Sequence, residues 1–235
     1  MAAEGGPNIS EDGLVLALDA SNSKSYPGSG TVWKDLSGNE NHFTLFNTPT
    51  FNSNGYFTFN GVNNYARSTN TIDLSSVNAV SVEVVFKVPS VTANEMVFEH
   101  TSNWNSNNGA FGAFTNSKGN LASSPSTDNF MHMNSEAGIL NSGPSTDLTT
   151  FNFNVMMYSN ANGVTHYNNN SQPGISTDIP STVTNFANAY TYIASRGGTT
   201  FYDGMDLAFI RIYSRELTTE EISQNYNATR RKFGL

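Results

Sequence analysis

The chain has 235 residues, no cysteine and a formal net charge of −8, and only 13% of its residues are charged. The lack of cysteine excludes a disulfide framework, thiolate metal sites and cysteine nucleophiles. Only 11 residues are basic, which argues against nucleic-acid binding, because such proteins need a basic stripe to neutralise phosphates, and against docking on anionic lipid.

The first predicted element is a loose leader, residues 1–12, which is a candidate docking arm. It has neither the basic region nor the apolar stretch of a signal peptide. The sequence contains no run of 18 apolar residues, so we expect no membrane insertion. Residues 13–235 are predicted to form one domain, because no linker divides them and their length allows a sizeable core.

The middle of the chain is predicted to consist of short strands. Apolar and polar residues alternate with period two over residues 80–88 and 151–157, which indicates antiparallel sheets with one face on a core. Asn-Gly and Asp-Gly pairs recur between the candidate strands and favour hairpin turns. The predicted fold class is therefore all-β, an antiparallel β-sandwich.

The last predicted element is one short C-terminal helix that begins near Thr218. Thr218 and Glu221 have the spacing of a capping box. Three basic residues fall in the predicted last turn, where they complement the helix dipole, and Gly234 follows as a stop; the three are Arg230, Arg231 and Lys232.

Both ends of the chain resemble laminin-G-like, concanavalin A-type jelly rolls. The C-terminal match runs from Gly204 to Tyr213 and continues through Arg215, Leu217 and residues 219–222. The N-terminal matches are residues 13–20, the W-x-D-x-S-G-N-x-N loop at 33–41 and residues 57–65. The resemblance implies a concanavalin A-like jelly roll, a fold that hosts lectins, adhesion modules, hydrolases and virion parts. It also implies that Trp33 and Tyr202 are packing residues.

Calcium is the one cofactor that this resemblance suggests. Laminin-G-like domains often hold the ion on loops at one rim, and calcium prefers oxygen ligands. The candidates here are Asp35, Asn39, Asn41, Asp203 and Asp206. However, Asn60, Asn63 and Asn64 stand where the family usually has Asp. The alternative is that these residues form Asx-turns with their own backbone.

The best local candidate for sugar binding is Trp104, because an aromatic ring can stack on a pyranose while amides satisfy its hydroxyl groups. Four asparagines surround it, namely Asn103, Asn105, Asn107 and Asn108. The alternative is a tryptophan that covers the end of the sandwich or contacts a partner.

A paired-carboxylate hydrolase is not indicated by the acidic residues. Glu83 stands alone on its predicted strand. Glu95 and Glu99 would share one strand face at a separation of about 13 Å, which is too far for the paired mechanism. We interpret all three as polar residues on outward strand faces, and we predict that the protein is not an enzyme.

The opening residues indicate a function. Residues 5–9, followed by Asp12, Gly13 and Leu14, resemble the start of single-domain phage structural proteins. We therefore expect a virion protein exposed on the particle, as a capsid decoration or a fibre or tail component, which is made in the host cytoplasm without a signal peptide. Its expected partners are other virion proteins, host-surface polysaccharide in weak contacts, and further copies of itself. The alternatives are a dedicated carbohydrate-binding adhesin and a polysaccharide hydrolase or lyase.

Overall fold

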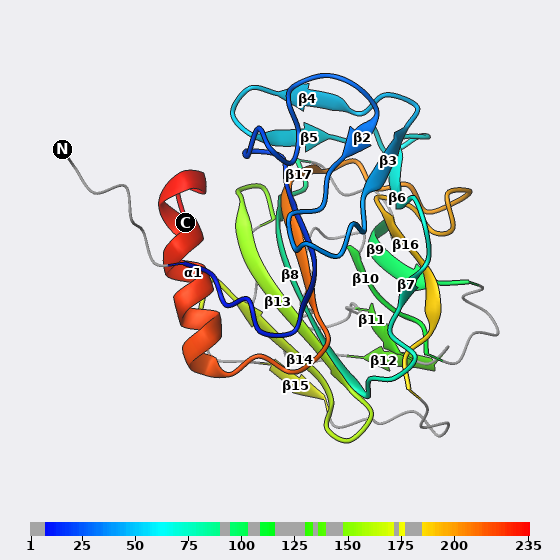
Figure 1. Cartoon of the computed structure of the whole chain (residues 1–235), viewed down its shortest axis with the longest axis vertical. Coiled ribbons are helices and arrows are strands. Elements are labelled where there is room, and N and C mark those ends of the chain that lie inside the picture. The colour runs from blue at the N-terminus through cyan, green and yellow to red at the C-terminus, as the bar shows by residue number, and fades with distance from the viewer. Residues whose placement is uncertain are drawn as a thin grey trace.

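The structure is a computed structural model, which describes residues 8–89, 95–102, 109–115, 130–133, 136–139, 148–171, 174–176 and 185–235. Two antiparallel sheets pack against each other as a sandwich, and one helix follows at the C-terminus (Figure 1). This is the predicted jelly-roll architecture.

The eight-stranded sheet has the order β15-β14-β13-β8-β17-β5-β4, and β1 pairs with β17 beside β5. Its strands are β1 (Leu14–Asp19), β4 (Thr50–Asn52), β5 (Tyr56–Thr58), β8 (Ala79–Lys87), β13 (Asn152–Ser159), β14 (Gly163–Asn168), β15 (Gly174–Ser176) and β17 (Asp206–Tyr213).

The nine-stranded sheet has the order β12-β11-β10-β9-β16-β6-β3-β2, and β7 pairs with β16. Its strands are β2 (Val32–Trp33), β3 (Phe43–Phe46), β6 (Tyr65–Ser68), β7 (Ile72–Asp73), β9 (Glu95–Thr101), β10 (Phe111–Thr115), β11 (Phe130–Met133), β12 (Glu136–Ile139) and β16 (Asn188–Ile193). Strands that lie far apart in the sequence are therefore neighbours in this sheet.

Large apolar side chains from both sheets fill the space between them. Trp33 is fully buried and packs edge-on against Phe57, with ring centroids 4.8 Å apart. Tyr158 reaches across from β13 and donates a hydrogen bond to the carbonyl of Gly112 on β10 at 2.8 Å. Each such burial removes a large side chain from water and contributes about 1.5–3 kcal/mol. The predicted packing role of Trp33 agrees with its position in this core.

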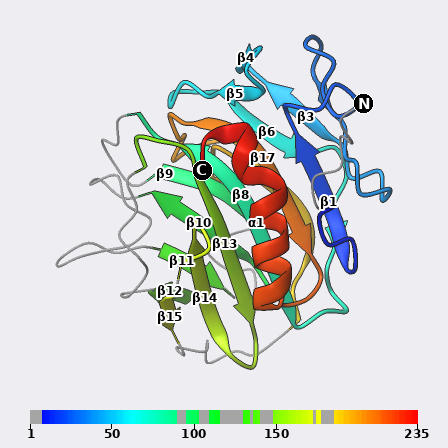
Figure 2. The same cartoon turned by 90° about the vertical axis from the view of Figure 1, so that its left-hand side faces the viewer.

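The helix α1 (Thr219–Phe233) lies against the outer face of the eight-stranded sheet (Figure 2). Its capping box is formed as predicted, since Thr218 Oγ1 accepts from the amide of Glu221 at 3.2 Å and the Glu221 carboxylate accepts from the amide of Thr218. Tyr226 packs on Phe153 with ring centroids 5.7 Å apart. A second apolar cluster therefore seals this face of the sheet.

In the part of the chain that the structure describes, no helix is both long enough and apolar enough to pass through a membrane.

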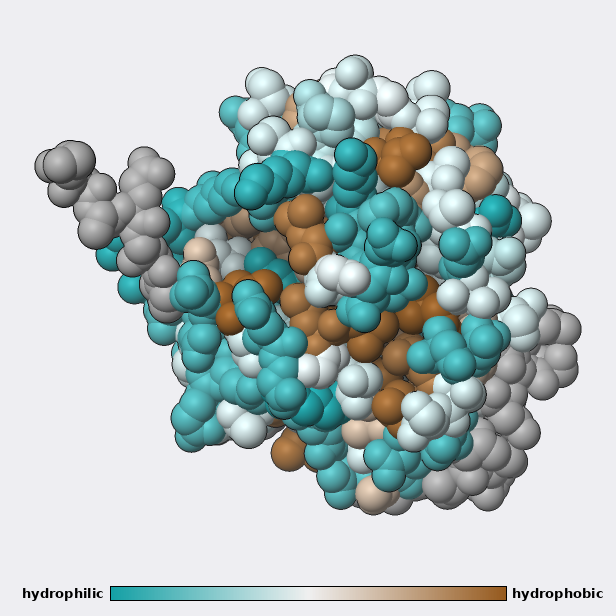
Figure 3. Space-filling model, viewed as in Figure 1, coloured by the Kyte–Doolittle hydropathy of each residue, from teal (hydrophilic) through white to brown (hydrophobic). Residues whose placement is uncertain are grey.

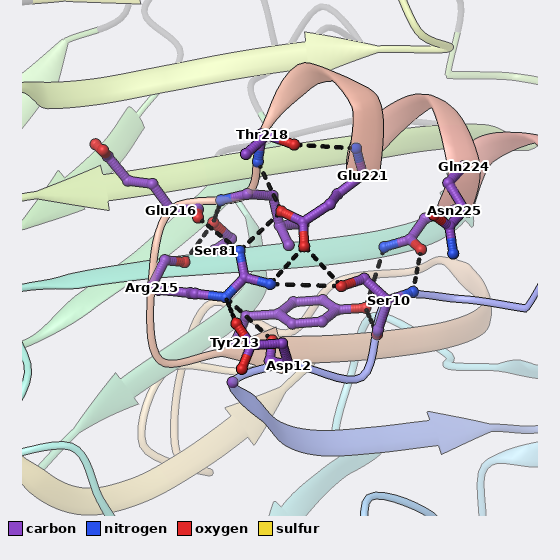
Figure 4. Close-up of polar contacts among 12 residues, drawn as sticks. Ser10, Asp12, Ser81, Tyr213, Arg215, Glu216, Thr218, Glu221, Gln224 and Asn225 are labelled. Atoms are coloured by element: carbon purple, nitrogen blue, oxygen red, sulfur yellow. Dashed lines mark hydrogen bonds and ion pairs between the residues drawn. The ribbon is translucent and has the colours of Figure 1, made fainter.

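The segment of residues 8–12 is held against α1, in contrast to the loose leader that the composition predicted (Figure 4). The amide of Ser10 donates to Asn225 Oδ1 at 2.7 Å, and its hydroxyl donates to Glu221 Oε1 at 2.8 Å. Arg215 forms ion pairs with both Asp12 and Glu221, at 2.8 Å and 2.5 Å. One arginine thus joins the N-terminal segment to the start of the C-terminal helix.

A carboxyl group is buried beneath α1. Glu83 on β8 has no exposed surface, and its oxygens accept from Asn225 Nδ2 at 2.7 Å and Arg211 Nη1 at 3.0 Å. The interpretation of Glu83 as an outward polar residue is therefore wrong, because the helix covers the strand face on which it lies. Burial raises the pKa of Glu83, and the charge of Arg211 opposes that rise.

A cavity of about 500 Å³ lies beside this network. Its apolar wall includes Ile9, Leu14 and Leu36, and Arg211 also lines it. On the face seen in Figure 3, hydrophobic side chains appear between hydrophilic ones in the middle of the view. The charge of Arg211 is already paired with Glu83, so this cavity offers a ligand no unpaired cation from that residue.

Candidate functional site

The outward side of the nine-stranded sheet carries a row of aromatic and charged residues from four neighbouring strands. Phe46 on β3 is opposite Tyr65 on β6, Arg67 on β6 is opposite Tyr192 on β16, and Tyr192 is opposite Glu99 on β9. Residues directly opposite in a ladder point to the same face, as do residues two apart on one strand. We name this surface the aromatic face and define it by Phe46, Tyr65, Arg67, Tyr190, Tyr192 and Glu99.

The rings of the aromatic face are partly exposed and contact one another. Phe46 and Tyr65 are stacked, with centroids 4.5 Å apart and planes 4° from parallel. Tyr190 and Tyr192 lie 6.5 Å apart on β16. Such contacts restrict the rings, so the face has a defined shape before any ligand binds.

The edge of the aromatic face is fixed by a glycine. Gly198 has a φ of +73°, and a Cβ atom there would lie 3.0 Å from the Tyr65 ring. The hydroxyl of Tyr202 donates to the Gly198 carbonyl at 2.7 Å, and its ring lies 6.3 Å from Tyr65. A side chain at position 198 would therefore displace Tyr65. Tyr202 is partly exposed at this edge of the face, next to the sheet.

Arg67 lies between two rings of the aromatic face. The centre of its guanidinium is 4.7 Å from the Tyr190 ring centroid and 5.3 Å from the Phe46 ring centroid. These distances are those of cation–π contacts. Its Nε atom is buried, and neither that atom nor the guanidinium has a hydrogen-bond or ion-pair partner among the described residues.

Glu99 differs from the outward, solvated residue that we predicted. Its side chain has no exposed surface. One oxygen, Oε2, accepts from the amide of Gly197 at 3.2 Å, while Oε1 has no partner among the described residues. Burial raises the pKa of Glu99 to about 7, and the charge of Arg196 opposes that rise. This carboxyl group is therefore partly protonated near neutral pH.

Glu95 does not share the face of Glu99, contrary to the prediction. A register shift between Ala113 and Phe114 places Glu95 opposite Thr115. Thr115 lies on the same side of β10 as Ala113, which belongs to the core, whereas Glu99 is opposite Gly112. The bulge thus sends the two glutamates to different sides of the sheet.

A pair of carboxyl groups forms where Glu95 meets Asp203. Asp203 is fully buried and accepts a hydrogen bond from Thr115 Oγ1 at 3.2 Å. Burial, and then the negative charge of Glu95, raise the pKa of Asp203 to about 8. The two carboxyl groups thus favour the state in which Asp203 carries a proton.

The loop of residues 33–41, which supplied three candidate calcium ligands, fastens the edge of β1. Asp35 Oδ1 accepts from the amide of Ala17 at 2.8 Å, and Oδ2 accepts from the amide of Asn41 at 3.0 Å. The side-chain amide of Asn39 donates to the Leu14 carbonyl, and that of Asn41 donates to the Val15 carbonyl. The oxygens of Asp35 are thus occupied by protein donors.

The other two calcium candidates lie elsewhere and do not meet at one point. Asp206 forms an ion pair with Lys87 at 3.2 Å and accepts from Thr58 Oγ1 at 2.5 Å, whereas Asp203 faces Thr115 and Glu95. Over the described ranges, no three His, Asp or Glu residues are grouped so that they could hold a metal ion. The residues as placed do not fit a calcium site, and the ion itself stays a prediction.

The candidate sugar-binding residues Trp104, Asn103, Asn105, Asn107 and Asn108 lie outside the described residues. The chain enters that stretch directly after Thr101 and Ser102, and Thr101 is opposite Tyr190 in the sheet. Their role stays a prediction.

A family model described as the concanavalin A-like lectin/glucanases superfamily matches residues 59–223, which is more than half of the chain. The chain belongs to this superfamily. No curated protein matches the sequence significantly.

Solved structures share this concanavalin A-like fold at low sequence identity. A Trypanosoma rangeli sialidase in complex with sialic acid is 16% identical, with a TM-score of 0.65 over 94% of this chain and 33% of that one. The binding domain of botulinum neurotoxin serotype D is 13% identical, with a TM-score of 0.65 over 93% of this chain and 52% of that one. The chain therefore spans about a third of the sialidase and about half of the toxin domain.

These structures correct one prediction. We predicted a protein that is not an enzyme, and this is contradicted because several structures of the same fold are sialidases, which are enzymes. Because the sequence identity is low, the similarity to these structures shows a shared fold and nothing more. Membership of a lectin and glucanase superfamily supports carbohydrate binding or hydrolysis as the class of function.

The aromatic face was not predicted from the sequence, although the sequence contains a signal for it. Tyr65 and Arg67, like Tyr190 and Tyr192, are two residues apart in predicted strands, so each pair had to share a strand face. What was missing was the knowledge that β6 and β16 are neighbours, which places the two pairs together.

Proposed function

We propose that the chain is a carbohydrate-recognition domain and that the aromatic face is its binding surface. The observation that carries this proposal is the set of partly exposed rings around Arg67. Aromatic rings stack on the apolar face of a sugar ring, while a guanidinium and tyrosine hydroxyl groups can satisfy sugar hydroxyls. Membership of the lectin/glucanase superfamily supports the same class of ligand.

The test is a comparison of two tyrosine variants on a glycan array, followed by calorimetry on the best ligand. Tyr190→Ala should weaken binding at least about fivefold, because stacking of one ring is worth about 1 kcal/mol or more when the contact is desolvated. Tyr56→Ala is the matched control, since Tyr56 is a partly exposed tyrosine on β5 of the other sheet. Equal effects of both substitutions would contradict the proposal.

We further propose that the domain is displayed on a phage particle, as a capsid decoration or a fibre or tail component that attaches to host-surface polysaccharide. The opening residues 5–14 and a surface poor in charge support this setting. Mass spectrometry of purified virions should find the protein at a copy number close to that of capsid or tail subunits. Its absence from purified particles would refute the virion setting and leave the binding proposal standing.

The second candidate function is glycoside hydrolysis. The observation in its favour is Glu99, a carboxyl group on the outward side of the nine-stranded sheet whose pKa burial raises to about 7. A carboxyl group that is protonated near neutral pH suits a general acid. If the protein is a hydrolase, it should release reducing sugar from a bound polysaccharide, and Glu99→Gln should abolish that release. Binding without any release of sugar would rule this candidate out for the polysaccharide tested.

A further inference from the structure

The charge of Arg67 has no counter-ion in the described part of the protein, and this separates it from the partly buried cations on the other sheet. Lys87 is paired with Asp206 at 3.2 Å, Arg211 with Glu83 at 3.0 Å, and Arg215 with Glu221. These cations form ion pairs within the protein and so have a structural role. Arg67 instead lies at the surface between the rings of Phe46 and Tyr190.

The surroundings of Arg67 hold its guanidinium in place without using its N–H groups. The two rings contact the cation through their π faces, which accept no conventional hydrogen bond from it. Tyr192 lies directly opposite on β16, and Glu99 is one strand further, with its Cα about 10 Å from that of Arg67 given the usual strand spacing. The N–H groups are donors in a fixed fork, which matches the two oxygens of a carboxylate or sulfate group.

We propose that the aromatic face selects glycans that carry an anionic group, either a carboxylate or a sulfate. In this proposal, which rests on the carbohydrate-binding function proposed above, Arg67 binds the anionic group while the neighbouring rings stack on the sugar. The occupant is one acidic residue of a short glycan segment. A highly charged polyanion fits poorly, because the whole chain carries a net charge of −8 and would repel it.

The test uses glycans in matched pairs on one array. Each uronic acid oligosaccharide is printed as the free carboxylate and as its neutral methyl ester, and each sulfated oligosaccharide is printed with its desulfated form. The wild-type protein should prefer the anionic member of a pair by about tenfold or more. The two kinds of pair show whether the anion is a carboxylate or a sulfate.

Variants of Arg67 then assign the preference to this residue. Arg67→Gln should remove the preference, so that the anionic and the neutral member of each pair bind equally well. Arg67→Lys should retain part of it, because the charge remains while the planar fork is lost. Arg215→Gln is the control, since it removes an arginine on the helix side. Melting curves of each variant verify that it is folded.

Three outcomes separate this inference from the proposed function. Loss of anion preference in Arg67→Gln supports both. Equal binding to both members of every pair, or a preference that survives Arg67→Gln, overturns the selection by Arg67 and leaves carbohydrate binding intact. Failure of the folded wild-type protein to bind any glycan overturns both.

Discussion

Glu83 and Glu99 occupy comparable positions in the two sheets and have opposite surroundings. Each carboxyl group lies on an inner strand, on the outward side of its sheet, and each is fully buried. Both oxygens of Glu83 have partners, and the helix α1 supplies one of them through Asn225. Glu99 has a partner for one oxygen only among the described residues.

The arginines repeat this difference. Arg211 is ion-paired with Glu83 on the neighbouring strand, while the Arg67 guanidinium lies between the faces of two rings and has no ion-pair partner among the described residues. A polar group that is buried and fully paired stabilises one structure, whereas a polar group left without a partner costs free energy unless a ligand satisfies it. We therefore regard the eight-stranded side as structural and the aromatic face as functional.

The largest expected effect is on stability, from removing the cation of the buried pair. Arg211→Ala should lower the free energy of unfolding by about 3–5 kcal/mol, because it leaves the Glu83 carboxylate buried and unpaired. Arg67→Ala should lower the free energy of unfolding by no more than about 1 kcal/mol, since the contacts that it removes are those of the guanidinium with two partly exposed rings. Urea denaturation measures both. Similar losses for the two variants would remove the distinction between the two faces.

The pH dependence of stability should reveal the carboxyl groups on the nine-stranded side. The pKa of Glu99 is raised to about 7 and that of Asp203 to about 8, so the folded state binds these protons more tightly than the unfolded state. Stability should then fall as pH rises from about 4 through 7 for Glu99 and through 8 for Asp203, by at most about 1.4 kcal/mol per pH unit for each group. Asp203→Asn should flatten this slope, because the amide stays neutral at every pH.

Two histidines should act in the opposite direction between pH 4 and 6.5, and so offset part of the carboxyl effect there. Burial lowers the pKa of both His100 and His166 to about 4, so between pH 4 and 6.5 the unfolded state binds more protons. Their contribution to stability should rise with pH in that window and disappear below it. His166→Asn tests the sign, and an unchanged slope between pH 4 and 6.5 would show that His166 titrates normally in the folded protein.

The smallest expected effect concerns the helix start. Thr218→Ala should cost about 1 kcal/mol, because the amide of Glu221 loses its cap. Arg215→Gln should cost a similar amount or less, since its ion pairs are partly exposed. It should also raise the hydrogen-exchange rate of the Ser10 amide, which is bonded to Asn225. Neither variant should alter glycan binding, because both act on the helix side.

The elements and the fold could be predicted from sequence because their causes are local. The period-two pattern around Glu83 defines a strand, and Thr218 with Glu221 defines the helix start. The burial of Glu83 was missed because α1, more than 130 positions later in the chain, supplies the cover. The alternation of apolar and polar residues shows which side of a strand faces outward. It does not show whether that side is covered by solvent or by a helix.

The site required information that is not local. Phe46, Arg67, Tyr190 and Glu99 come from four strands, and only the strand order brings them together. The face of Glu95 depends on a bulge beside Ala113, which changes the side of every residue beyond it. Trp104 was found because its neighbours in sequence are amides, and its role stays a prediction.

The most direct test of the account is to map ligand contacts on the intact chain by NMR, by titrating the glycan that binds best into isotope-labelled protein. We expect the largest shift changes on the aromatic face, at Phe46, Tyr65, Arg67, Tyr190 and Tyr192, while the helix α1 and the residues around Glu83 stay unchanged. Shift changes concentrated on α1 or on the cavity beside Arg211, with the aromatic face unperturbed, would contradict it.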